Sequence, residues 1–132
     1  MLKFDFPLDK KYQFISSPFG WRWIFGKWGF HGGVDYPCPN GAPIYAPYNG
    51  IIADVGKRLR AGNILVVNHP SVGDVQTVYY HLKKVLFRVG QEIQRGEVIA
   101  ETDNTGTWVL GNGHLHYGVR VNGHWIDPCL TY

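Results

Sequence analysis

The chain has 132 residues, of which 45% are hydrophobic and 17% are charged. This length and composition are typical of one globular domain and exclude an intrinsically disordered chain. The formal net charge is only +3, which does not require a nucleic-acid partner. We therefore expect a single domain over residues 1–132, monomeric and without nucleic acid among its partners.

The N-terminal segment contains no apolar run long enough for a signal peptide or a membrane span. We expect no membrane insertion, and release by cell lysis or as a virion component. Cys38 and Cys129 are the only cysteines, and neither lies in a C-x-x-C spacing, which argues against a cysteine zinc site. The pair leaves two alternatives open, one disulfide or two buried thiols.

Strand signals dominate the chain from residue 42 onward. The 17 glycines and 8 prolines are spread along the sequence, and no segment shows a helical stripe over ten or more residues. Runs rich in β-branched and aromatic residues are bounded instead by turn residues. The predicted strands fall within residues 42–56 (broken by Pro47 and Asn49-Gly50), 63–69, 75–82, 89–102 and 114–121. Asn122-Gly123 then predicts a two-residue hairpin turn. We expect an all-β fold with mainly antiparallel strands.

Two histidines flank one leucine in the segment His114-Leu115-His116. Side chains two residues apart on a strand point to the same side, about 7 Å apart along the backbone. The two imidazoles therefore share a face while Leu115 turns to the core. Such a pair can share a metal ion, or one imidazole can bind the metal while the other acts on a water. Taken alone, the pair is a weak signal, because two histidines on a solvent-facing strand are more often simply exposed. We expect His69 and His124 to be structural or exposed.

A second cluster spans His31 to Asp35 in the segment H-G-G-V-D. In an extended chain residues 31, 33 and 35 share a face, and Gly33 leaves room for an ion between the other two. The alternative is a glycine turn with an incidental aspartate. Together the two clusters would supply His31, Asp35 and one strand histidine, with one tetrahedral position left open, as in catalytic zinc sites. The other strand histidine and His81 would remain for acid–base work.

The sequence resembles the lysostaphin-like, LytM-type zinc metallopeptidases, which cut peptide bonds in bacterial peptidoglycan. The resemblance runs from about residue 16 to residue 128. The motifs that carry it, in family order, are SSPFGWR, HGGVDY, GAPIYAPYNGIIADVG, GNILVVNH, VYYHL, VGQEIQRGEVIAETDNTG and GHLHYGVRVNGHWIDP. It implies an all-β, mainly antiparallel single domain, with a duplicated hybrid motif and loops that form a zinc groove.

The resemblance also implies a role for four of these histidines and for one aspartate. His31, Asp35 and His116 match the Zn²⁺ ligands, while His81 and His114 match the catalytic pair that lines the open zinc position. The implied activity is a zinc-dependent endopeptidase that hydrolyses cross-links or bridges of peptidoglycan, with stem peptides or cross-bridges as partners. We expect it to act on the cell wall, in the periplasm or outside the cell, for lysis of the phage-lysin type. Asp103-Asn104 and Gly113 depart from the family pattern without touching a ligand.

Three alternatives stay open at this point. Inactive relatives serve as peptidoglycan-binding regulators, although such relatives lose ligands or catalytic histidines and all five are present here. A histidine phosphocarrier domain shares the glycine-spaced pattern of residues 89–100. A carboxypeptidase that trims stem peptides would use the same zinc chemistry. The aromatic loop of residues 20–30 either walls the groove, stacking on peptide or sugar, or forms a lid packed on the core.

Overall fold

The computed structural model describes residues 2–106 and 113–132, and strands account for most of their regular structure. Three short 3-10 helices accompany them: η1 (Lys10–Tyr12) before the first strand, η2 (Pro70–Val72) between two strands, and η3 (Pro128–Thr131) after the last strand. The strands are β1 (Gly20–Ile24), β2 (Lys27–His31), β3 (Val34–Pro37), β4 (Pro43–Tyr45), β5 (Gly50–Arg58), β6 (Gly62–Asn68), β7 (Val75–Val85), β8 (Glu92–Ile93), β9 (Val98–Thr102), β10 (His114–Val121) and β11 (His124–Ile126).

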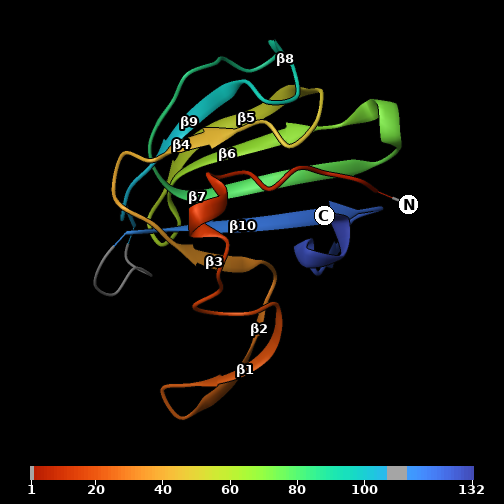
Figure 1. Ribbon diagram of the computed structural model, residues 1–132. Helices are drawn as coiled ribbons and strands as arrows, with labels where there is room; N and C mark the ends of the chain where they lie inside the picture. Colours follow the sequence, from red (N-terminus) through yellow and green to blue (C-terminus); the bar gives the residue numbers. More distant parts are fainter. Residues whose placement is uncertain (1, 107–112) are drawn as a thin grey trace.

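Nine of these strands form one sheet in which every pairing is antiparallel. Its main path runs β11-β10-β7-β6-β5-β8, while β3 pairs with β10 and β9 pairs with both β7 and β4. The strands β1 and β2 form a separate hairpin that projects away from the sheet beyond β3 (Figure 1). The expectation of an all-β, mainly antiparallel fold is confirmed.

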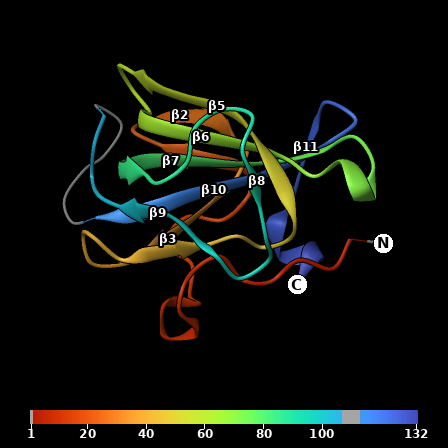
Figure 2. The ribbon, with the colours of Figure 1, turned by 90° about the horizontal axis from the view of Figure 1, so that it is seen from above.

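The two termini lie side by side at one end of the sheet in both ribbon views (Figure 2). The N-terminal segment is held there by main-chain hydrogen bonds, because the Phe4 N–H donates to the Thr131 carbonyl at 2.7 Å. Among the described residues, no helix is long and apolar enough to cross a membrane.

Strand β10 follows the alternation that its sequence predicts. Leu115, Tyr117 and Val119 are fully buried in the core, whereas His114 and His116 keep partial exposure on the other face. The turn after β10 has positive φ at both Asn122 (51°) and Gly123 (79°), the backbone that a two-residue hairpin with right-handed strand twist requires. The predicted β10–β11 hairpin is therefore confirmed.

The core also encloses a fully bonded polar chain around His69. The His69 Nδ1–H donates to the Asn49 carbonyl at 2.8 Å, so Nε2 is the acceptor for the Thr77 hydroxyl, also at 2.8 Å. The Tyr79 hydroxyl donates in turn to Thr77 Oγ1. His69 is thus a structural histidine, and His124 is exposed, as expected.

The two cysteines are free. Cys38 is buried beyond the end of β3, and Cys129 is exposed in η3. The alternative of one disulfide is therefore wrong. The alternative of two buried thiols is correct for Cys38 but not for Cys129, which is exposed.

Candidate active site

Strand register brings the predicted ligands together. Strand β10 lies between β3 and β7, so His116 is opposite Asp35 on one side and Tyr80 on the other. Because β2 leads into β3 through only two glycines, His31 arrives at the same place from the end of the projecting hairpin. The residues that carry the site therefore come from three separate stretches of sequence.

Three side chains converge on one point. His116 Nδ1 lies 3.0 Å from Asp35 Oδ1 and 3.1 Å from His31 Nε2, and His31 Nε2 lies 3.3 Å from Asp35 Oδ1. In the described part of the chain, this is the one group of three or more His, Cys, Asp or Glu side chains placed to share a metal ion. Two imidazole nitrogens and one carboxylate oxygen form a donor set compatible with zinc.

The backbone around His31 orients this cluster. The His31 Nδ1–H donates to the Pro18 carbonyl at 2.9 Å, which leaves Nε2 free to face Asp35. Gly33 packs closely against β10, because an added Cβ would lie 2.5 Å from the Tyr117 carbonyl and 2.9 Å from His116 Nε2. The chain is not continuously extended here, since β2 ends at His31 and β3 begins at Val34. The expected single extended stretch is wrong in this detail, and room for an ion between His31 and Asp35 stays a prediction.

His81 and His114 form a second pair beside the cluster. Their ring centroids are 4.9 Å apart at an interplanar angle of 62°, and the His81 ring is 6.4 Å from that of His116. A regular strand would send Tyr80 and His81 to opposite faces. His81 instead has a φ of 67°, and Tyr80 stacks on His116 with centroids 4.7 Å apart. This left-handed residue lets two consecutive side chains reach the same site.

Two loops hold His81 in that unusual conformation. Its N–H donates to the Ala61 carbonyl at 2.8 Å, and its carbonyl accepts the Asp103 N–H at 3.0 Å. The imidazole Nδ1–H donates to the Thr105 carbonyl at 2.8 Å, and the Thr105 hydroxyl donates to the Leu82 carbonyl. His81 Nε2 is therefore the ring atom left for chemistry.

Burial and hydrogen bonding set the charges of the site. Burial raises the pKa of Asp35, but hydrogen bonds from His116 and His31 outweigh it and hold that pKa well below its usual value. Burial lowers the pKa of His116, against the opposing effect of Asp35. Burial also lowers the pKa of His81 to about 4. At neutral pH these lowered pKa values leave Asp35 ionised and His116 and His81 neutral. An ionised carboxylate and a neutral imidazole are the forms that bind a metal.

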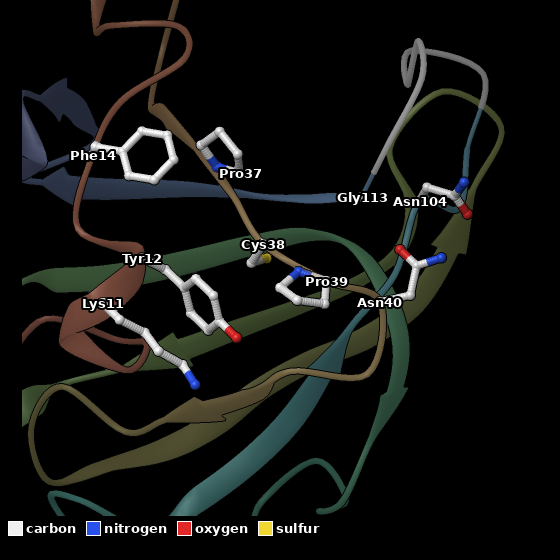
Figure 3. Close-up of a pocket in the computed structure, with 9 residues that line it drawn as sticks. All are labelled: Lys11, Tyr12, Phe14, Pro37, Cys38, Pro39, Asn40, Asn104 and Gly113. Atoms are coloured by element: carbon white, nitrogen blue, oxygen red, sulfur yellow. The ribbon is translucent and has the colours of Figure 1, made fainter.

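A pocket of about 620 Å³ lies beside this site, next to the start of β10. Pro37, at its edge, is the cross-strand partner of His114. Figure 3 shows Tyr12 and Phe14 from the N-terminal segment directed toward Pro37–Asn40. The residues that line the pocket are Lys11, Tyr12, Phe14, Pro37, Cys38, Pro39, Asn40, Asn104 and Gly113.

Sequence reasoning missed the groups that orient the histidines. Strand alternation sends Tyr80 and His81 to opposite faces, and the pairing of Tyr80 with His116 leaves His81 to be brought to the site by its left-handed backbone. The Pro18 and Thr105 carbonyls leave no signal in the sequence, because any residue type supplies one. The aromatic loop proves to be the exposed β1–β2 hairpin. Its tryptophans Trp21, Trp23 and Trp28 are exposed, so the expected lid packed on the core is wrong for them.

Comparison with known proteins agrees with this geometry. Residues 29–128 match the family profile described as Peptidase family M23. A relative from Vibrio cholerae, named peptidoglycan DD-endopeptidase ShyB, is 38% identical over 125 residues. That match covers 92% of this chain but only 28% of the relative, so the chain spans less than a third of that protein's length.

Solved structures show the same likeness. A structure described as a zinc containing peptidase from Vibrio cholerae has a TM-score of 0.82 and 37% identity, covering 95% of this chain and 39% of that chain. The catalytic domain of the antimicrobial peptidase lysostaphin from Staphylococcus simulans has a TM-score of 0.76 and 27% identity, covering 92% of both chains. The chain belongs to peptidase family M23, and its fold is the lysostaphin-like fold that the sequence motifs predict.

Proposed function

We propose that this protein is a zinc-dependent endopeptidase that hydrolyses peptide cross-links or bridges of bacterial peptidoglycan. The observation that carries the proposal is the convergence of His31, Asp35 and His116 beside the His81–His114 pair. The substrate class rests on the name of the relative described above, a peptidoglycan DD-endopeptidase. Membership in a peptidase family favours this function over the phosphocarrier alternative.

The donor set fits a catalytic zinc ion. His31 Nε2, His116 Nδ1 and Asp35 Oδ1 would hold the metal and leave a fourth position open. When bound, zinc would act as a Lewis acid that polarises the scissile carbonyl and lowers the pKa of a water. A glycine at position 33 lets the His116 ring lie close to the loop that joins His31 to Asp35.

His81 and His114 would move the protons. Neutral His81 keeps an unprotonated Nε2, because its Nδ1–H donates to the Thr105 carbonyl. That lone pair suits His81 to accept a proton from the attacking water. His114, whose ring lies 4.9 Å away, would then donate to the oxyanion that develops on the scissile carbonyl.

Action on peptidoglycan would place the protein at the cell wall, in the periplasm or outside the cell. A role in wall lysis of the phage-lysin type remains part of this proposal. An inactive regulatory role is less favoured, because all five residues of the motifs are present and face one another.

The test is digestion of purified peptidoglycan from one diaminopimelate-type wall and one glycine-bridged wall, with and without a zinc chelator. Mass spectrometry of the products should show new amino termini that vanish with the chelator and return with added zinc. Release of single terminal residues only would identify a carboxypeptidase instead. No cleavage of either wall by zinc-loaded protein would contradict the endopeptidase and favour the regulator. His124→Ala, an exposed histidine outside the site, should cleave like wild type.

A further inference from the structure

The β1–β2 hairpin carries four aromatic side chains on one face. Strand register pairs Trp21 with Phe30 and Trp23 with Trp28. Residues two apart, and residues directly opposite in an antiparallel pair, share a face of the sheet. We call these four residues, Trp21, Trp23, Trp28 and Phe30, the aromatic face.

The aromatic face is open to solvent. Its side chains are between 48% and 72% exposed, which is far more than the core aromatic residues. The rings of each cross-strand pair meet at 64° and 74° with centroids 5.5 Å apart, so that the pairs are edge-to-face rather than closed stacks. A contiguous apolar patch of this kind marks an interaction surface.

We propose that the aromatic face binds the glycan strand of peptidoglycan, in addition to the peptide bound at the cluster. Sugar rings present flat C–H faces that pack on aromatic rings, and indole N–H groups can donate to sugar hydroxyls. The face consists of rings alone, since the one aliphatic side chain of the two strands, Ile24, lies on the reverse face. Planar rings without aliphatic side chains suit a sugar better than the irregular surface of a protein partner.

The position of the hairpin supports this occupant. Phe30 directly precedes His31, so the aromatic face begins one residue along the chain from a proposed metal ligand, and strand alternation turns its rings to the side opposite the His31 imidazole. Strands of five residues extend it about 17 Å outward. Figure 1 shows the hairpin projecting from the sheet beside β3, the strand that carries Asp35. This inference rests on the proposed function, because a stem peptide held at the cluster is attached to a glycan strand.

A lipid surface is the main rival occupant, and the charges of the hairpin argue against it. Membrane adsorption combines apolar side chains with a cluster of lysine and arginine. The two strands carry only Arg22 and Lys27, both on the reverse face. Arg22 is hydrogen-bonded to the Ser17 hydroxyl and so is tied to its own domain.

The test uses the whole chain, peptide-free glycan strands and a double variant, Trp23→Ala with Trp28→Ala. Leu130→Ala is the matched control, because Leu130 is 71% exposed and lies in η3, away from the hairpin. Calorimetry should show glycan binding by wild type and the control, and binding about tenfold weaker or worse in the double variant. The double variant should cleave a soluble cross-linked stem-peptide dimer that carries no sugar at the wild-type rate but release fragments from intact sacculi more slowly. Matching circular dichroism and zinc content would show that the variant is folded.

Three kinds of binding result would overturn the inference. Glycan strands that fail to bind wild type, or that bind the double variant equally well, contradict it directly. Loss of binding to phosphatidylglycerol vesicles in the variant, without glycan binding by wild type, would assign the face to a membrane. A wild-type dimer that the double variant abolishes would assign it to a second copy. If wild type cleaves neither substrate, the proposed function fails, while the binding measurement still decides the aromatic face.

Discussion

Asp35 and His116 lie opposite each other in the antiparallel pair of β3 and β10, and Asp35 Oδ1 is 3.0 Å from His116 Nδ1. The two residues are 81 positions apart in sequence, and strand register alone joins them. A slip of one residue in β10 would turn His116 to the opposite face of the sheet. The proposed metal site is therefore built into the backbone pairing of the central sheet.

The proposed roles divide the five site residues into metal ligands and proton-transfer residues, and the two groups should respond differently to substitution. Asp35→Asn or His116→Ala removes a ligand, so we expect both the stoichiometric zinc and the hydrolysis of peptidoglycan to be lost. His81→Ala or His114→Ala leaves the three ligands intact, so zinc should stay bound while turnover falls about 10²–10⁴-fold. Zinc content by plasma mass spectrometry and cleavage of purified peptidoglycan measure the two properties separately. Loss of zinc in the His81 or His114 variant would overturn this division.

Gly33 and Gly29 provide a matched pair of substitutions. An alanine Cβ at position 33 would meet the Tyr117 carbonyl at 2.5 Å, and backbone cannot move aside cheaply. Gly33→Ala should therefore lower the free energy of unfolding by about 1–3 kcal/mol and weaken zinc binding. At Gly29 an added Cβ meets nothing within 4 Å, and Gly29→Ala should behave as wild type. Urea unfolding and zinc titration of both variants give the comparison, and equal stability would show that the space at Gly33 is not needed.

Most of the fold could be predicted because its strands are locally encoded. The alternation of β10 and the Asn122-Gly123 turn each specify their structure within a few residues. Strand order could not be predicted in the same way. The path β11-β10-β7-β6 depends on contacts between segments far apart in sequence, which periodicity alone does not encode.

The predicted site residues lie together, but strand alternation explains the placement of only some of them. Alternation correctly puts His114 and His116 on one face. It cannot predict that Tyr80 and His81, neighbours in the chain, both reach the site, because this needs the positive φ of His81. That conformation is held by the Ala61 and Asp103 main chain, so it is a tertiary property.

Buried His69 should make the stability of the zinc-free protein depend on pH. Burial lowers the pKa of His69, against the opposing hydrogen bond to the Asn49 carbonyl. Below a pH of about 6.5 the unfolded chain therefore binds a proton that the folded chain resists. The free energy of unfolding is highest above that pH and falls as the pH drops toward the folded-state pKa, by at most about 1.4 kcal/mol per pH unit for one group.

Urea unfolding across this range measures the effect. His69→Gln should reduce the pH dependence and leave the part that comes from His81 and His116, whose pKa values burial also lowers. His124→Gln, at an exposed position, should leave the wild-type slope unchanged. A wild-type slope in the His69 variant would assign the pH dependence to another residue.

Removing the hydroxyl group of Tyr117 and that of Tyr79 should change the stability of the fold in opposite directions. Both are fully buried, and their rings are 5.4 Å apart. The Tyr117 hydroxyl has no hydrogen-bond partner within the described residues, whereas the Tyr79 hydroxyl donates to Thr77 Oγ1. Removing an unpaired buried hydroxyl relieves a desolvation cost, so Tyr117→Phe should stabilise the fold by about 1 kcal/mol. Tyr79→Phe should destabilise it by about the same amount, because it breaks the chain of hydrogen bonds to His69. Thermal unfolding should show midpoints displaced in opposite directions, and a loss of stability in Tyr117→Phe would mean that its hydroxyl is paired in solution.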